Sequence, residues 1–191
     1  MIGELVRKAR SYRRYIEEPI KEETLRELVD LARLSASAAN RQPLKYILSF
    51  KKETNNLIFP LLAWAAYLKD WAGPEEGQRP SAYIIILGDT SISKSVNCDH
   101  GIASQSIVLG AAEKGLACCM IGAVNRERLR EIFKVPEQFD ILHLIALGRP
   151  GEEIRIEKVG PDGDIKYWRD DSGVHHVPKR SLDEIIIPIN N

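Results

Sequence analysis

Two segments, Arg10–Arg14 and Ser37–Pro43, carry the residue types best suited to bind a flat, phosphorylated ligand. The second reads Ser-Ala-Ala-Asn-Arg-Gln-Pro and combines a hydroxyl with two carboxamides, which both donate and accept hydrogen bonds. Its small alanines allow the backbone to approach a ligand closely. The first reads Arg-Ser-Tyr-Arg-Arg, and its forked guanidinium donors suit a phosphate, although a solvated charged face fits them equally well. Together the segments indicate a nucleotide-like cofactor.

Regular elements must position these segments. Residues 21–35 show one apolar stripe behind two glutamates, which predicts a helix, and residues 46–50 predict a strand. The segment Ser37–Pro43 is therefore expected to be a loop between two rigid elements. Further along the chain, helices are predicted over 99–114 and 126–133, and strands over 82–87, 117–121 and 140–147.

The remaining stretches leave alternatives open. Residues 57–71 predict a partly helical segment interrupted by Pro60, whose aromatic residues either pack in the core or form a mobile wall over a ligand. Residues 73–80 are a lid or a connector. Residues 160–164 predict a tight turn between hairpin strands. The apolar tail 185–189 needs a surface to pack on, which a second subunit would provide.

Sequence motifs of other enzyme classes do not occur. There is no G-x-G-x-x-G, no G-x-x-x-x-G-K-[ST] and no G-x-S-x-G. The four histidines lack metal-ligand spacing, and no cysteine cluster joins them, so no metal site is expected. His175 and His176 are neighbours that point apart on an extended chain. Cys118 and Cys119 are expected to be small buried strand residues rather than a redox pair.

Composition bounds the class of protein. The 191 residues suffice for one domain, expected to span 1–191, with mixed helices and strands. Lys plus Arg and Asp plus Glu both number 27, and this balance argues against nucleic acid as the partner. An odd count of three cysteines favours a reducing, cytoplasmic location. The start of the chain has no signal-like apolar run, and no stretch approaches the ~20 residues that cross a membrane.

Taken in order along the chain, these motifs resemble the nitroreductase family of flavin enzymes. The resemblance rests on six stretches that follow one another over nearly the whole sequence: residues 10–15, 37–43, 99–105, 115–122, 146–150 and 179–184. It implies a three-layer α+β fold with a mostly antiparallel sheet flanked by helices. It also implies a homodimer with FMN bound at the subunit interface and NADH or NADPH as reductant.

The resemblance also assigns expected cofactor-binding residues. Arg10, Ser11 and Arg13 match the first flavin-binding segment, with Arg13 near the pyrimidine edge of the ring. Ser37, Ala38 and Asn40 match the second segment, which reaches the flavin from the partner subunit, and Gln42 is expected to bind the cofactor beside them. Ile121 and Gly122 match the strand end beside the ring. The remaining matches are Gly148, Arg149, Lys179 and Arg180. Among these, Lys179 and Arg180 are expected at the phosphate, where Gly148 and Arg149 assist.

The expected activity is hydride transfer from NAD(P)H to small acceptors such as nitroaromatics or quinones by a ping-pong mechanism. No catalytic side chain is expected, since the flavin carries the chemistry. Departures from the family pattern at Ala36, Leu44 and Met120 alter the pocket wall and leave the acceptor open. A flavin-binding module and a flavin-consuming or dehalogenating enzyme on the same scaffold remain alternatives.

Overall fold

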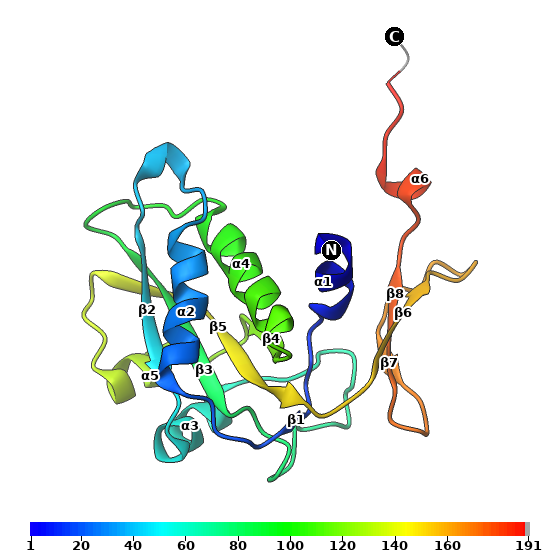
Figure 1. The fold of residues 1–191 in the computed structure, drawn as a ribbon, viewed down its shortest axis with the longest axis horizontal. Helices are drawn as coiled ribbons and strands as arrows, with labels where there is room; N and C mark the ends of the chain where they lie inside the picture. The colour runs from blue at the N-terminus through cyan, green and yellow to red at the C-terminus, as the bar shows by residue number, and fades with distance from the viewer. Residues whose placement is uncertain (190–191) are drawn as a thin grey trace.

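The computed structural model describes residues 1–189, and a five-stranded antiparallel sheet forms its centre (Figure 1). The long strand β5 (Phe139–Pro150) pairs with β3 (Ala82–Asp89), and β3 pairs in turn with β2 (Leu44–Ser49). Strands β4 (Ala117–Ile121) and β1 (Tyr15–Ile16) also pair with β5. Every residue of β3 is buried, which explains its unbroken apolar sequence.

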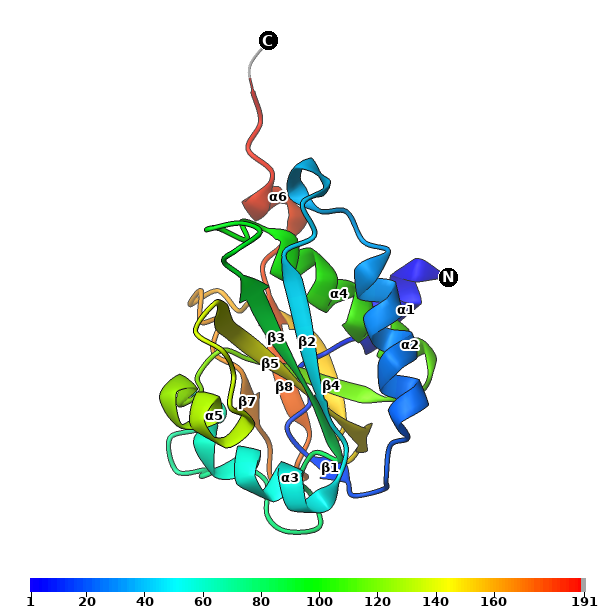
Figure 2. The same cartoon turned by 90° about the vertical axis from the view of Figure 1, so that its left-hand side faces the viewer.

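Helices cover both faces of this sheet, as Figure 2 shows from the side. Side chains alternate along β3, so Ile84 and Ile86 face one core and Tyr83 and Ile85 face the other. The first core is closed by α2 (Glu22–Arg33) and α4 (Asp99–Glu113), and the second by α3 (Lys52–Ile58) and α5 (Arg126–Phe133). The resulting three layers confirm the predicted α+β class.

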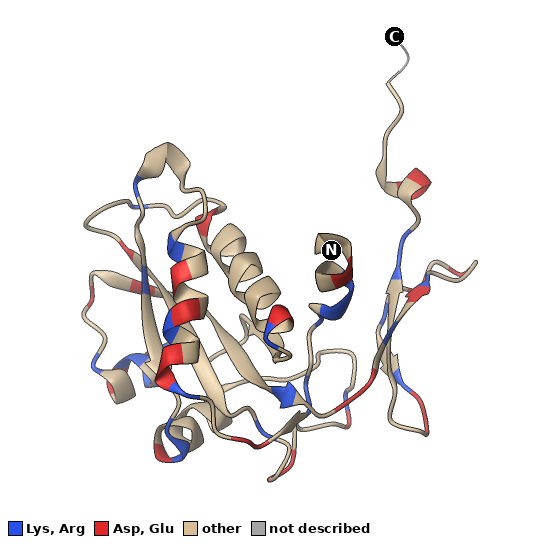
Figure 3. Ribbon diagram, viewed as in Figure 1, with Lys and Arg blue, Asp and Glu red and all other residues tan. Residues whose placement is uncertain are grey.

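The charge pattern distinguishes the two helices of the first layer (Figure 3). Helix α2 carries acidic and basic residues along its length, whereas α4 carries charged residues only near its ends. The small residues of α4 let it approach α2 closely: a Cβ atom on Gly110 would lie 2.2 Å from Cδ1 of Leu31. Within residues 1–189, no helix is long and apolar enough to cross a membrane.

A second, three-stranded sheet lies beside the first one (Figure 1). It consists of β6 (Ile154–Lys158), β8 (His175–Lys179) and β7 (Trp168–Arg169), in that spatial order. The predicted turn exists, since Gly163 N donates to Gly160 O. The predicted hairpin around it is wrong, because β6 pairs in parallel with β8 and not with the strand that follows the turn. Helix α6 (Leu182–Ile185) and the tail then project away from the body.

Two other predicted segments can now be given exact bounds. Residues 57–71 are helical only in part, as predicted: α3 ends at Ile58, the short 3-10 turn Phe59–Leu61 contains Pro60, and Ala65 beyond it has a positive φ of 43°. The strand predicted over 140–147 runs on to Pro150, because β1 pairs with its last residues. The short first helix, α1, spans Ile2–Lys8. The other predicted helices and strands are confirmed to within a few residues.

Candidate functional site

The arginine segment Arg10–Arg14 crosses from α1 to β1 beside β4. Tyr12 N donates to Cys118 O at 2.9 Å, and Ser11 forms a bridge with the same cysteine. Cys118 and Cys119 are buried free thiols, as expected, and burial raises the pKa of Cys119 to about 11. Strand β4 therefore fixes the backbone of this segment, while the arginine side chains remain partly exposed.

Arg13 is held from several directions. Its Nη1 lies 2.9 Å from Nε2 of His175 and 3.2 Å from Ser11 O, and its guanidinium stacks 4.3 Å from the ring centre of Tyr167. Burial, followed by the charge of Arg13, lowers the pKa of His175 to about 4. The imidazole is therefore neutral at pH 7, so Nε2 accepts from the guanidinium and leaves its positive charge intact.

Glu152 anchors the same segment through its backbone. Its side chain is 1% exposed, and Oε1 accepts from the backbone N–H of Arg13 at 2.5 Å and of Arg14 at 3.0 Å. Oε2 accepts from Arg169 at 2.8 Å. The sequence gives no signal for this role, since Glu152 stands next to Glu153, which pairs with Arg155 on the surface. His175, Tyr167 and Arg169 were likewise not predicted as neighbours of Arg13.

Several buried guanidinium nitrogens around this segment have no protein partner. Within residues 1–189, no acceptor reaches the buried Nε atoms of Arg10, Arg14 and Arg169. A buried donor without an acceptor is costly, and an anionic ligand removes that cost. The arginine segment is therefore chemically suited to a phosphorylated, electron-rich cofactor.

The loop Ser37–Gln42 contributes the carboxamides. Asn40 and Gln42 are exposed, and Gln42 Nε2 donates to Asn40 Oδ1 at 3.1 Å, so the two amides lie together. Ala39, Asn40 and Gln42 adopt positive φ values of 51°, 53° and 52°. This conformation is uncommon for residues other than glycine.

The other predicted site residues lie at three places. Ile121 is buried at the end of β4, and the carbonyl of Gly122 accepts from Arg126. Gly148 packs so tightly that a Cβ atom would lie 2.6 Å from Tyr15. The remaining three are exposed: Arg149, which pairs with Glu18, Arg180, which pairs with Glu184, and Lys179 at the end of β8.

One chain does not bring these groups together. The Ser37–Gln42 loop leads into β2 at Leu44. Leu44 pairs with Gly88 of β3, and Gly88 pairs in turn with Asp140 of β5, so the loop lies at this end of the sheet. Gly148 lies eight residues along β5 at the other end, which amounts to about 27 Å of strand. Figure 1 shows this separation, with the loop above the sheet and β1 below it.

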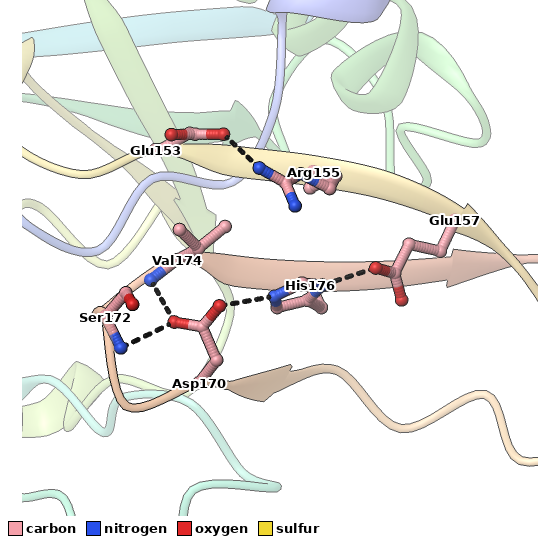
Figure 4. Close-up of polar contacts among 7 residues, drawn as sticks. All are labelled: Glu153, Arg155, Glu157, Asp170, Ser172, Val174 and His176. Carbon is pink, nitrogen blue, oxygen red and sulfur yellow. Dashed lines mark hydrogen bonds and ion pairs between the residues drawn. The ribbon is translucent and has the colours of Figure 1, made fainter.

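A second polar cluster surrounds His176 (Figure 4). Its Nδ1 lies 2.5 Å from Oε1 of Glu157 on β6, and its Nε2 lies 3.1 Å from Oδ2 of Asp170. The ring of Trp168 stacks on the imidazole at 4.0 Å. Hydrogen bonds from Asp170, and then from Glu157, raise the pKa of His176. This cluster holds the second sheet together, and no metal-binding group of three ligands occurs within residues 1–189.

Comparison with known proteins identifies the class. The sequence model of the nitroreductase family matches residues 6–149, so the chain belongs to the nitroreductase family. It is 30% identical over 156 residues to a Methanothermobacter thermautotrophicus protein provisionally named NADH dehydrogenase/NAD(P)H nitroreductase, covering 78% of this chain and 77% of that protein. Membership makes the chain an oxidoreductase.

Solved structures share the fold. An FMN-dependent nitroreductase from Clostridium difficile R20291 superposes with a TM-score of 0.68 at 24% identity, covering 100% of this chain and 99% of that one. A nitroreductase family protein from Streptococcus pneumoniae TIGR4 gives 0.71 at 16% identity, covering 99% and 100%. A provisionally named nitroreductase from Exiguobacterium sibiricum, in complex with FMN, gives 0.66 at 18% identity, covering 79% and 89%.

Proposed function

We propose that this oxidoreductase uses FMN to transfer hydride from NADH or NADPH to small acceptors, such as nitroaromatics or quinones, in a ping-pong cycle. When bound, FMN supplies the redox chemistry. Two observations carry the proposal: the guanidinium of Arg13 is fixed by His175 and Tyr167, and the same segment holds buried Nε atoms of Arg10 and Arg14 that no acceptor within residues 1–189 reaches. Such donors complement a phosphate and the electron-rich pyrimidine edge of a reduced flavin.

Arg13 is assigned to the pyrimidine edge of the flavin. The neutral imidazole of His175 and the ring of Tyr167 hold its guanidinium in place without neutralising it. A cation placed beforehand stabilises negative charge that develops nearby without further reorganisation. Arg13 therefore favours the reduced cofactor, while Asn40 and Gln42 supply amide contacts.

We further propose that two copies form a homodimer with the flavin between them. The arginine segment and the Ser37–Gln42 loop lie at distant places of one chain, so a second copy would complete each site. The exposed apolar tail supports an assembly, since Ile187 and Ile189 are 84% and 82% exposed. A cytoplasmic location is proposed because all three cysteines are free thiols.

An anaerobic titration tests the redox proposal. The purified protein, reconstituted with FMN, is mixed with NADH or NADPH while flavin absorbance is followed. Loss of the oxidised spectrum, and its return when a quinone or nitroaromatic is added, is the expected result. Bound FMN that neither nicotinamide bleaches would instead identify a flavin-binding module, and destruction of the chromophore in air would identify a flavin-consuming enzyme.

Variants test the binding residues. Arg13→Ala and Asn40→Ala are expected to weaken FMN binding by about tenfold each, as loss of a direct polar contact predicts. The control is Arg26→Ala, which removes an exposed arginine paired only with Glu22 on α2. Equal FMN affinity in Arg13→Ala and the control would contradict the assignment. Light scattering of the eluted protein should give the mass of two chains.

A further inference from the structure

Asp99, the first residue of α4, makes contacts that its motif did not predict. Its side chain is 4% exposed. Its Oδ2 accepts from Ser37 Oγ at 2.6 Å, and its Oδ1 accepts from Ala38 N at 3.0 Å. Both carboxylate oxygens therefore grip the start of the carboxamide loop, at the helix end where a negative charge is favoured.

The Ser37 hydroxyl extends this grip to the far end of the loop. Because its proton is donated to Asp99, its oxygen is free to accept, and Gln42 N donates to it at 2.9 Å. A relay of hydrogen bonds thus runs from Asp99 through Ser37 to Gln42. The relay clamps both ends of the loop around Asn40.

The backbone between these ends requires such a clamp. Ala39, Asn40 and Gln42 all have positive φ, a conformation that persists only when the surroundings hold it. Among the residues that the structure describes, the side chains of Asn40 and Gln42 bond only to each other and to Asn40 O. The chain just after the loop is tied to β3 by Asp89 N, which donates to Pro43 O at 2.8 Å, and the start of the loop is held by the carboxylate at the end of α4.

We propose that Asp99 is a positioning residue for cofactor binding: it selects the loop conformation in which Asn40 and Gln42 present their amides to the flavin. This inference rests on the proposed function. A protein that binds only in one conformation loses apparent affinity in proportion to the fraction of molecules in that conformation. Releasing the loop should therefore raise the Kd for FMN without removing any atom that touches it.

The experiment measures FMN binding to apoprotein by flavin fluorescence. Asp99→Ala is expected to raise the Kd by about tenfold, as a fall of the competent fraction to about one tenth requires. Asp99→Asn keeps one acceptor oxygen, so its Kd for FMN should lie between those of Asp99→Ala and the wild type. Asp99→Ala and Ser37→Ala together should weaken binding no more than the stronger single variant, because both break one relay.

Asp89 provides a matched control. It is 5% exposed, and its carboxylate accepts from the hydroxyl of Ser91 and from Ser91 N at 3.0 Å, the same pair of donor types that Asp99 holds. Asp89→Asn removes a comparable buried carboxylate and leaves in place the backbone N–H of Asp89, which donates to Pro43 O beside the loop. Its Kd for FMN should stay within about twofold of wild type, the variation expected of a site that does not contact the ligand.

Hydrogen exchange of the backbone amides gives a readout that does not depend on flavin. The Gln42 amide should exchange faster in Asp99→Ala and Ser37→Ala than in wild type, while amides of β3 keep their protection. Two results would overturn the positioning role while leaving the proposed function intact. One is unchanged exchange at Gln42, and the other is an FMN affinity of Asp99→Ala and Asp99→Asn equal to that of Asp89→Asn. A wild-type protein that binds no FMN overturns the proposed function, and the positioning role with it.

Discussion

Replacing Glu152 with alanine tests how the arginine segment is held. The carboxylate is 1% exposed and accepts from the backbone of Arg13 and Arg14 and from the Arg169 guanidinium, which is itself 12% exposed. Removing one partner of a buried ion pair costs about 3–5 kcal/mol. Each backbone N–H left without an acceptor adds about 1–3 kcal/mol unless water enters, and the half-buried segment admits water. We therefore expect a total loss of about 4 kcal/mol.

Urea denaturation of apoprotein measures this loss. With a typical slope of about 2 kcal/mol per molar urea, the midpoint should fall by about 2 M. The neighbouring Glu153→Ala is the control, since its side chain is 62% exposed and pairs with an exposed Arg155, so its cost should stay below about 1 kcal/mol. If Glu152→Ala loses as little free energy of unfolding as Glu153→Ala, the reasoning is refuted. Water would then accept the hydrogen bonds of Arg13, Arg14 and Arg169 at no cost.

Two further substitutions follow from the structure. Hydrogen bonds to Asp170, and then to Glu157, raise the pKa of His176 in the folded protein above its ordinary value of 6.5. The protonated His176 therefore stabilises the fold fully below pH 6.5, and this stabilisation is lost as the pH rises through the pKa of the folded state. The difference in unfolding free energy between wild type and His176→Gln should therefore shrink as the pH rises above 6.5, and a difference that stays constant would contradict this. Gly148→Ala should destabilise apoprotein by about 1–3 kcal/mol, since its Cβ would lie against the buried ring of Tyr15. Unaltered thermal unfolding of that variant would contradict the packing role.

The sequence predicts strands β2 to β5 and helices α2, α4 and α5 well because each of these elements has one dominant local signal. The unbroken apolar run of β3 and the single apolar stripe of α2 each fit one structure. Helix α5 also begins with a local signal, since Asn125 accepts from Arg128 N as an N-cap residue. Such signals depend on neighbours in the chain, so no tertiary information is needed.

The second sheet could not be predicted in the same way. Its central strand β8 pairs in parallel with β6 across an intervening turn and β7, and short polar strands carry no signal for parallel pairing. A turn such as Gly160–Asp164 favours a hairpin locally, and tertiary pairing overrode that preference. The aromatic residues of 57–71 left two alternatives open, core packing or a wall over a ligand. Trp64 packs on Phe59, and Tyr67 lies against Tyr167, a contact that spacing along the chain does not reveal.

The candidate site shows the same limit in its chemistry. Arg13 and Asn40 are assigned to a ligand on their residue types, and this assignment stays a prediction. The residues that hold them could not be predicted, because Glu152 is 139 residues from Arg13 and Asp99 is 61 residues from Ala38. Both carboxylates bind their segment through backbone N–H groups. Anchoring of this kind does not use the guanidinium and carboxamide side chains, so each segment can be held rigidly while these groups keep their positions for a ligand.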